Sequence, residues 1–218
     1  ELTEIVEQEN RSMIVNMLYL RKSLERARER CRKLEEDAVE LTEKSERDPL
    51  TGLANRYRLT NDSEKIVEQC FAEHKPLSFE ILDIDYFKQY NDRYGHQAGD
   101  DCVRAIVALI RQMESDQIFC ARYGGDEFVI IYSGMSAEEV CERAEKLRQD
   151  VMALQIEQRY AEGSFGVTIS QGICHDIPSN GNKNWDFLHV ADQALYRVKR
   201  RGRNRLCMTD IHGREIEV

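Results

Sequence analysis

Two pairs of carboxylates in this 218-residue chain, one closing an apolar run and one between two apolar runs, have a spacing that suits metal chemistry. Asp83 and Asp85 close the apolar run that begins at Leu77, and because they are two residues apart they share one face of a β-strand. Asp126 and Glu127 follow two glycines between two further apolar runs. Hard ions such as Mg²⁺ take oxygen ligands, commonly one or two carboxylates together with substrate phosphates. A strand that simply exits into solvent would also explain the first pair.

The turn around Asp126 adds a second observation. Gly124 and Gly125 can adopt a positive φ and allow a ligand close to the backbone. A hairpin turn explains two glycines and one acid, but it does not explain a second acid beside the first. If the two strands are neighbours, Asp126 opposite Asp83 completes a two-carboxylate Mg²⁺ site. Such a site suits two-metal nucleotidyl transfer, in which the ions hold the attacking and leaving oxygens.

A dense basic cluster lies near the C-terminus. Six of the nine residues from 197 to 205 are Lys or Arg, although the formal net charge of the chain is 31 − 40 = −9. Cations at the end of a helix complement its dipole, but six exceed what a helix end needs. A triphosphate ligand would explain the excess, because Lys and Arg form strong charge-assisted hydrogen bonds to phosphate oxygens. The acidic balance and the absence of interleaved aromatic residues argue against a nucleic-acid partner.

The segment from Asn91 to Asp100 allows two interpretations. An Asn amide can donate to guanine O6 or N7, and a carboxylate can accept from N1 and N2. The alternative is a turn rich in Asn, Asp and Gly, followed by Asp100 as the N-cap of a helix. Spacing alone favours the turn.

Hydrophobic periodicity gives the elements that must position these residues. We expect helices over 55–74, from Asp100 onward, over 137–154 after a capping box of Ser136 and Glu139, and over 186–200. Strands are expected over 77–85, 118–122, 128–132, 165–173 and 205–209. The order of elements, with a hairpin in the middle, predicts an α+β fold: a central, mostly antiparallel sheet with helices packed on it.

Residues 1–47 contain no Gly or Pro and predict one long helix, which ends at Asp48-Pro49. Its apolar stripe follows the three-and-four spacing of a coiled coil, and Asn10 fits the register. We expect a dimerising helix; the alternative is packing on its own domain. The stripe consists of Val6, Met13, Met17, Leu20, Leu24, Ala27, Cys31, Leu34, Ala38 and Leu41.

Composition bounds the setting of the protein. The seven scattered cysteines include no CxxC and are expected to be reduced thiols of a cytoplasmic protein. No run approaches the ~18 apolar residues that a membrane span needs. The chain begins at Glu1 without an initiator Met or signal peptide, so we expect a fragment, the cytoplasmic portion if a membrane segment lies upstream.

Taken together, these blocks resemble the GGDEF family of diguanylate cyclases over about residues 48–210. Such domains resemble the palm domains of polymerases and nucleotidyl cyclases, which agrees with the expected α+β fold. The matching blocks are Asp48-Pro-Leu-Thr-Gly-Leu-Ala-Asn-Arg56, Asp83-Ile-Asp-Tyr-Phe-Lys-Gln-Tyr-Asn-Asp92, Gly95-His-Gln-Ala-Gly-Asp100, Arg122-Tyr-Gly-Gly-Asp-Glu-Phe128, and Ala191-Asp-Gln-Ala-Leu-Tyr196 continuing to Asn204.

The resemblance implies condensation of two GTP into cyclic di-GMP and two pyrophosphates. Residues 48–218 would form the catalytic domain, which binds one GTP. Residues 1–47 would form the dimer that brings two such domains face to face, with an upstream sensor as input. Two Mg²⁺, or Mn²⁺, would serve each GTP. The implied roles are these: Asp83, Asp126 and the Ile84 carbonyl hold metal; Asn91 and Asp100 read guanine; Phe87 and Lys88 line the phosphate loop; Lys199 and Arg203 hold the terminal phosphates; and Glu127 assists the second metal or takes the 3′-hydroxyl proton.

One departure from the family pattern matters. Ser115 and Ile118 replace the two ends of the Arg-x-x-Asp site through which many members bind product, so we expect no product inhibition through that site. Rival functions are a catalytically silent domain that binds GTP as a regulatory module, a cyclase that accepts adenine, and a coiled-coil adaptor. Asp100 disfavours adenine because a carboxylate repels its N1 acceptor.

Overall fold

The structure is a computed structural model that describes residues 17, 20–26, 28–33, 46–158 and 166–217. The chain divides between Ser45 and Glu46 into two units. In the first unit the described residues are helical, and the side chains of Met17, Leu20 and Leu24 are each more than half exposed. The remaining stripe positions other than Cys31, which is also exposed, lie outside the described residues.

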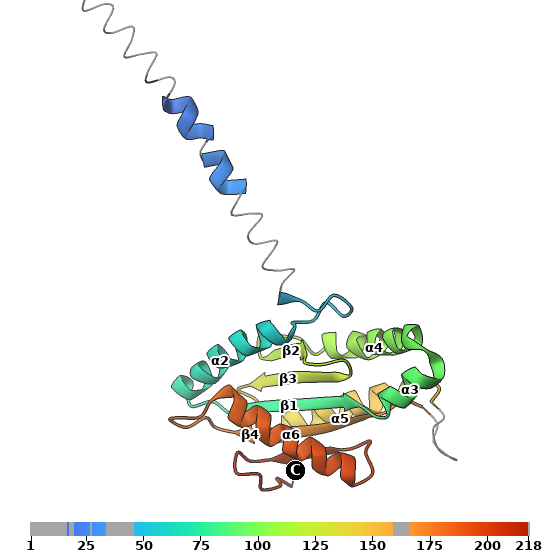
Figure 1. Cartoon of the computed structure of the whole chain (residues 1–218). Coiled ribbons are helices and arrows are strands. Elements are labelled where there is room, and N and C mark those ends of the chain that lie inside the picture. Colours follow the sequence, from blue (N-terminus) through green and yellow to red (C-terminus); the bar gives the residue numbers. More distant parts are fainter. Residues whose placement is uncertain (1–16, 18–19, 27, 34–45, 159–165, 218) are drawn as a thin grey trace, which may run out of the picture. The chain divides into compact units, whose positions relative to one another are not determined.

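In the second unit, the described residues form one five-stranded sheet in the order β2-β3-β1-β4-β5 (Figure 1). Three of the four strand pairs are antiparallel, and only β4 and β5 run parallel. This confirms the predicted α+β fold with a mostly antiparallel sheet. The strands are β1 (Leu77–Ile84), β2 (Ile118–Arg122), β3 (Glu127–Ser133), β4 (Ile169–Asp176) and β5 (Leu206–Thr209).

Helices cover both faces of this sheet. α4 and α5 pack on one face, against alternate β1 residues such as Leu82 and Ile84. α2 and α6 pack on the other face, against Phe79 and Ile81 (Figure 1). The alternation along β1 is the period of two that a strand imposes. The helices are α2 (Arg56–Glu73), α3 (Phe87–Tyr94), α4 (His96–Arg111), α5 (Ala137–Ala153) and α6 (Asn184–Arg200).

Local signals explain most helix boundaries. The Asn55 side chain accepts a hydrogen bond from the Arg58 backbone N–H and caps α2. The predicted capping box of Ser136 and Glu139 is present at the start of α5.

α6 begins at Asn184, two residues before the predicted position. The fourth strand begins at Ile169 and extends to Asp176, later than predicted.

The prediction that Asp100 begins a helix is wrong. α3 and α4 are two successive helices that break at Gly95, whose φ of 85° is accessible chiefly to glycine. Asp100 lies inside α4, and Asn91 lies on α3 rather than in a turn. The content of Asn, Asp and Gly in this segment predicts a turn along its length, whereas the chain leaves the helical conformation only at Gly95.

α6 lies unusually close to β4, and one glycine permits this. A Cβ at Gly172 would collide with the backbone of Ala191 and Leu195. The contact fixes the height of α6 on the sheet and therefore the place where its C-terminal turn, with Lys199, meets the end of β1. Among the described residues, none of the helices combines the length and the apolar character needed to cross a membrane.

Candidate active site at the ends of β1 and β3

The acidic residues of the two predicted strand ends lie together. β1 and β3 are neighbours, and Asp83 pairs in register with Glu127. The Ile84 N–H donates to the Asp126 carbonyl oxygen at 3.2 Å, so the hydrogen bonding between β1 and β3 continues as far as the turn. The neighbouring strands on which the two-carboxylate arrangement depended are therefore present, and Asp83, Asp126 and Glu127 share one corner of the sheet.

A cation from α6 reaches this corner. Lys199 Nζ lies 2.7 Å from Asp83 Oδ2. Burial, with smaller contributions from the charges of Asp126 and Glu127, outweighs the lowering effect of Lys199 and raises the pKa of Asp83 to about 6. A carboxylate that is costly to ionise and already holds one cation is suited to accept a stronger one.

The donor set fits Mg²⁺ but does not form a complete cage. Within the described ranges, no three of the His, Cys, Asp and Glu side chains converge to form a ready metal site. Mg²⁺ normally completes its oxygen shell with water and substrate phosphates around one or two carboxylates. Asp83 and Asp126, on adjacent strand ends, supply that number of hard oxygen donors.

The signature turn from Arg122 to Glu127 is held by its own backbone. The N–H groups of Tyr123 and Gly124 both donate to the Glu127 carbonyl, at 2.9 and 3.1 Å. Neither Gly124 nor Gly125 adopts a positive φ, so the turn does not use the left-handed backbone that these glycines allow. A Cβ at Gly124 would lie 3.0 Å from Glu127 Oε2, so the glycine leaves room for that carboxylate.

An ion pair ties the signature turn to the start of the domain. Arg122 Nη1 donates to Asp48 Oδ1 at 3.0 Å, and Arg122 Nη2 donates to the Gly125 carbonyl at 2.7 Å. Burial would raise the pKa of Asp48, but hydrogen bonds from Thr51 and Arg122 outweigh it and lower that pKa. The block at residues 48–56 therefore has a structural role in fixing the turn.

The basic cluster does not converge on one point. Lys199 faces Asp83, and Arg203 reaches Tyr86 and the vicinity of Asp85. Two others turn away: Arg197 donates to the Gly213 carbonyl, and Arg201 pairs with Glu215. Two of the six cations, the two expected to bind phosphate, thus lie at the end of β1.

The two candidate guanine-reading residues lie on adjacent helices, with Asn91 on α3 and Asp100 on α4. Asn91 Oδ1 is buried and has no hydrogen-bond partner within the described structure. A Cβ at Gly99 would collide with that oxygen. Gly99 therefore makes room for the Asn91 amide, whose oxygen occupies the space that a larger side chain at residue 99 would take.

Phe87 and Lys88 form the first turn of α3, directly after β1. Backbone N–H groups in a first helical turn lack partners within the helix and suit a phosphate. The Phe87 ring stacks on Tyr90, with centroids 6.3 Å apart, and packs against the core. Lys88 is exposed. The structure therefore places these two residues beside the acidic corner, with Phe87 serving the core.

Sequence reasoning missed Tyr86, Thr168 and Ser170, which surround Asp85 and Arg203. Thr168 and Ser170 are polar residues two apart at the start of an apolar strand, and they share this spacing with Asp83 and Asp85, which stand at the end of one. That pattern was the available signal. All seven cysteines are free thiols, as predicted.

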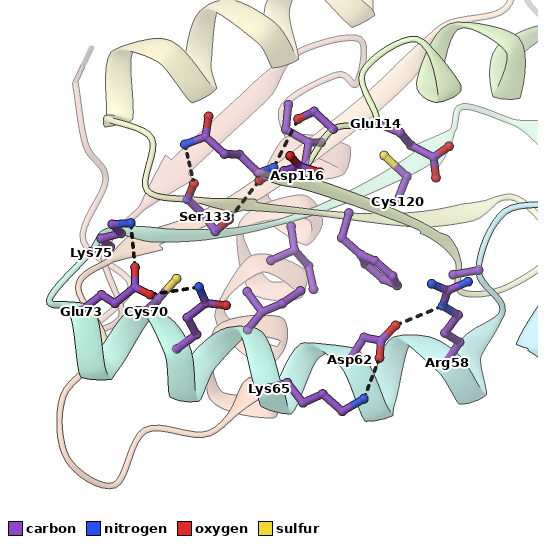
Figure 2. A pocket seen from close by; sticks show the side chains of 18 of the residues that line it. Arg58, Asp62, Lys65, Cys70, Glu73, Lys75, Glu114, Asp116, Cys120 and Ser133 are labelled. Carbon is purple, nitrogen blue, oxygen red and sulfur yellow. Dashed lines mark hydrogen bonds and ion pairs between the residues drawn. The ribbon is translucent and has the colours of Figure 1, made fainter.

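A pocket of about 530 Å³ lies elsewhere, between α2 and the edge strand β2 (Figure 2). Ser115 and Ile118 line it and exchange two backbone hydrogen bonds, at 3.2 and 3.1 Å. Figure 2 shows Arg58 and Lys65 both directed at Asp62, at 3.0 and 3.1 Å. The pocket therefore holds cations that already have partners.

Comparison with known proteins agrees with this geometry. A solved structure of the coiled coil and GGDEF domain of DgcB from Caulobacter crescentus, in complex with c-di-GMP, has a TM-score of 0.76 and 28% identity over 87% of this chain and 99% of that one. The active GGEEF domain of a diguanylate cyclase from Vibrio cholerae has a TM-score of 0.62 and 33% identity over 72% of this chain and 97% of that one.

Curated relatives agree. Diguanylate cyclase DgcP from Pseudomonas aeruginosa is 36% identical over 186 residues, 82% of this chain and 27% of that protein. A diguanylate cyclase from Vibrio cholerae serotype O1 is 35% identical over 187 residues, 79% of this chain and 53% of that protein. The chain thus spans about a quarter and about half of their lengths. The family model described as "Diguanylate cyclase, GGDEF domain" matches residues 45–205, and the chain belongs to this GGDEF family of cyclic di-GMP signalling proteins.

Proposed function

We propose that this chain is a diguanylate cyclase, a nucleotidyltransferase that condenses two GTP into cyclic di-GMP and two pyrophosphates. The observation that carries the proposal is the acidic corner where Asp83, Asp126 and Glu127 meet Lys199. A domain that only bound nucleotide or only joined helices would not need two carboxylates, Asp126 and Glu127, whose charges raise the pKa of a third, Asp83.

Each residue of the corner has a proposed task. Asp83, Asp126 and the Ile84 carbonyl would hold Mg²⁺, two ions per GTP, with Mn²⁺ as a substitute; the metal would supply Lewis acidity at the phosphate oxygens. Lys199 and Arg203 would hold the terminal phosphates, assisted by the first turn of α3 at Phe87 and Lys88. These groups neutralise the charge that develops on the leaving pyrophosphate.

The remaining residues orient the reactants. Asn91 and Asp100 would hold guanine by its polar edge. The 3′-hydroxyl of one GTP then attacks the α-phosphate of the GTP in the opposite domain, and the Glu127 carboxylate is a candidate acceptor for the hydroxyl proton. Most of the rate gain would come from holding both nucleotides in line, as is usual in phosphoryl transfer.

Two domains must therefore face one another, and we propose that residues 1–47 bring them together as a parallel coiled coil, with an upstream sensor as input. Two observations and one general argument support this. Met17, Leu20 and Leu24 are exposed at coiled-coil spacing in the single chain. The Caulobacter relative was solved as a coiled coil with its GGDEF domain. A short tether raises the effective concentration of the two half-sites to about the mM range.

The test is product analysis by mass spectrometry of the purified chain with Mg²⁺ and GTP, with Asp126→Ala as the matched variant. Cyclic di-GMP from the unsubstituted protein alone is the expected result. No product from either protein, at concentrations high enough to force dimers, would overturn the proposal and favour the silent GTP-binding module. Equal activity of the chain lacking residues 1–47 at nanomolar protein would contradict the proposed role of the helix alone.

A further inference from the structure

Asp85 is the most deeply buried carboxylate near the acidic corner, with 1% of the residue exposed. Thr168 Oγ1 donates to its Oδ2 at 2.7 Å, and Ser170 Oγ donates to its Oδ1 at 2.7 Å. The Asn204 backbone N–H also donates to Oδ2, at 3.1 Å. A buried carboxylate is unfavourable unless its oxygens are hydrogen-bonded, and these three donors meet that requirement.

The third donor belongs to a loop with an unusual backbone. Gly202, Arg203 and Asn204, directly after α6, all have positive φ angles of 106°, 63° and 48°. Side-chain-bearing residues avoid this region, so something outside the loop must hold it. Asp85 does so at the Asn204 backbone, and Arg148 Nη1 adds a hydrogen bond to Asn204 Oδ1 at 2.7 Å.

The same arrangement aims Arg203. Its Nε lies 4.0 Å from Asp85 Oδ1, and its Nη1 donates to the Tyr86 hydroxyl at 3.1 Å. The guanidinium also lies over the Tyr86 ring, 4.3 Å from its centre. Tyr86 has a φ of 57° and follows Asp85 directly. One short segment at the end of β1 therefore fixes both the loop and the direction of its arginine.

We propose that Asp85 is a positioning residue for the terminal phosphates of the bound nucleotide, acting through Arg203 and the 202–204 loop, and is not a metal ligand. Both of its oxygens already accept hydrogen bonds from neutral donors, whereas Asp83 faces Lys199 and the other acids. The inference rests on the proposed function, because it needs a triphosphate at Arg203.

The test compares GTP with GMP, which lacks the terminal phosphates. Binding is measured by calorimetry with Ca²⁺ in place of Mg²⁺ to suppress turnover. Asp85→Asn is expected to weaken GTP binding about tenfold, because it disturbs contacts to a charged group, and to leave GMP binding unchanged. Asp150→Asn, the same change in the surface ion pair with Lys146, is the matched control and should alter neither.

Thr168→Val guards against a variant that fails to fold, because Thr168 is only partly buried and valine keeps its shape. It should weaken GTP binding about threefold and leave GMP binding unchanged. Equal losses for GTP and GMP would overturn the proposal in favour of a general structural role. An increased Mg²⁺ requirement of Asp85→Asn with unchanged GTP affinity would overturn it in favour of a metal ligand. If the unsubstituted protein binds GMP and GTP equally, the proposed function fails as well, and this inference falls with it.

Discussion

The ammonium group of Lys199 lies 2.7 Å from the Asp83 carboxylate, and this ion pair joins the end of α6 to the end of β1. Both side chains are largely shielded, so the pair is screened less than a surface pair. In the proposed site the two groups have different ligands, a metal ion for Asp83 and a phosphate for Lys199. Binding of a metal–nucleotide complex would therefore replace the Lys199–Asp83 ion pair by two contacts to the ligand, one from Asp83 to the metal ion and one from Lys199 to a phosphate.

Separate substitution of the two partners should give different losses. Asp83→Asn removes a proposed metal ligand and is expected to lower kcat at least about a hundredfold. The reason is that the Mg²⁺ ion, which would neutralise the negative charge of the transition state, is held less firmly. Lys199→Met removes a phosphate contact and should raise KM for GTP about tenfold. Steady-state kinetics at several Mg²⁺ concentrations distinguish the two effects.

The Mg²⁺ dependence provides the control for this pair. Lys199→Met leaves the carboxylates in place and removes the cation that competes for Asp83, so it should not raise the Mg²⁺ concentration needed for half-maximal rate. A higher Mg²⁺ requirement in that variant would show that Lys199 supports metal binding, contrary to the exchange described above.

Gly99 provides a second prediction, for base recognition. Gly99→Ala would place a methyl group against Asn91 Oδ1 and 3.3 Å from Phe87 Cζ. The Asn91 side chain can move aside, and alanine is a better helix former than glycine by about 1 kcal/mol. We therefore expect unchanged or higher thermal stability together with a KM for GTP raised about tenfold, measured by unfolding scans and initial rates.

A double-mutant cycle isolates the cause. In an Asn91→Ala background, Gly99→Ala should have little further effect on KM, because the displaced amide is already absent. Additive losses from the two substitutions would mean that Gly99 acts through Phe87 or the helix rather than through Asn91.

Sequence reasoning could predict the sheet and most helices because their signals are local. The capping box at Ser136 and the apolar run from Leu77 each act within a few residues. The break at Gly95 was missed because a positive φ leaves no periodic trace in the sequence. For the same reason Asp100 was placed at a helix start instead of inside α4.

The candidate site could be predicted only in part. The sequence predicts Asp126 opposite Asp83 only if their strands are neighbours; β1 and β3 are neighbours, and Glu127, next to Asp126, is the residue that pairs with Asp83. The different environments of Asp83 and Asp85 could not be predicted, because they depend on which strand and loop arrive from 83 and 119 residues further along the chain. The same limit applies to Glu80, whose partners Tyr132 and Gln171 come from β3 and β4.

Glu80 leads to a prediction of pH-dependent stability. Burial raises its pKa above the ordinary 4.5, although hydrogen bonds from Tyr132 and Gln171 oppose the shift. The folded state therefore binds the Glu80 proton more tightly than the unfolded state does. Its stabilising contribution is complete below pH 4.5 and is lost as the pH rises through the folded-state pKa. The free energy of unfolding should accordingly fall with rising pH.

Glu80→Gln should remove this component, so the difference in unfolding free energy between Glu80→Gln and the unsubstituted protein should grow with pH. Urea titrations from about pH 5 to 8 measure it. Glu142→Gln, on the exposed side of α5, is the matched control and should give a constant difference. A constant difference for Glu80→Gln would mean that Glu80 is ionised when folded, contrary to the direction argued from its burial.

The pocket beside β2 yields the last prediction, that product does not inhibit through Ser115 and Ile118. Ser115 has no charge to offer a phosphate, and the Ile118 side chain is 3% exposed and belongs to the core. The nearby cations Arg58 and Lys65 are already paired with Asp62. Adding cyclic di-GMP to the assay at about tenfold over the protein should therefore leave the initial rate unchanged, since guanidinium contacts to phosphate are missing. Inhibition at micromolar product that Arg58→Ala relieves would contradict this, and would mean that the Arg58–Asp62 pair opens to admit the dinucleotide.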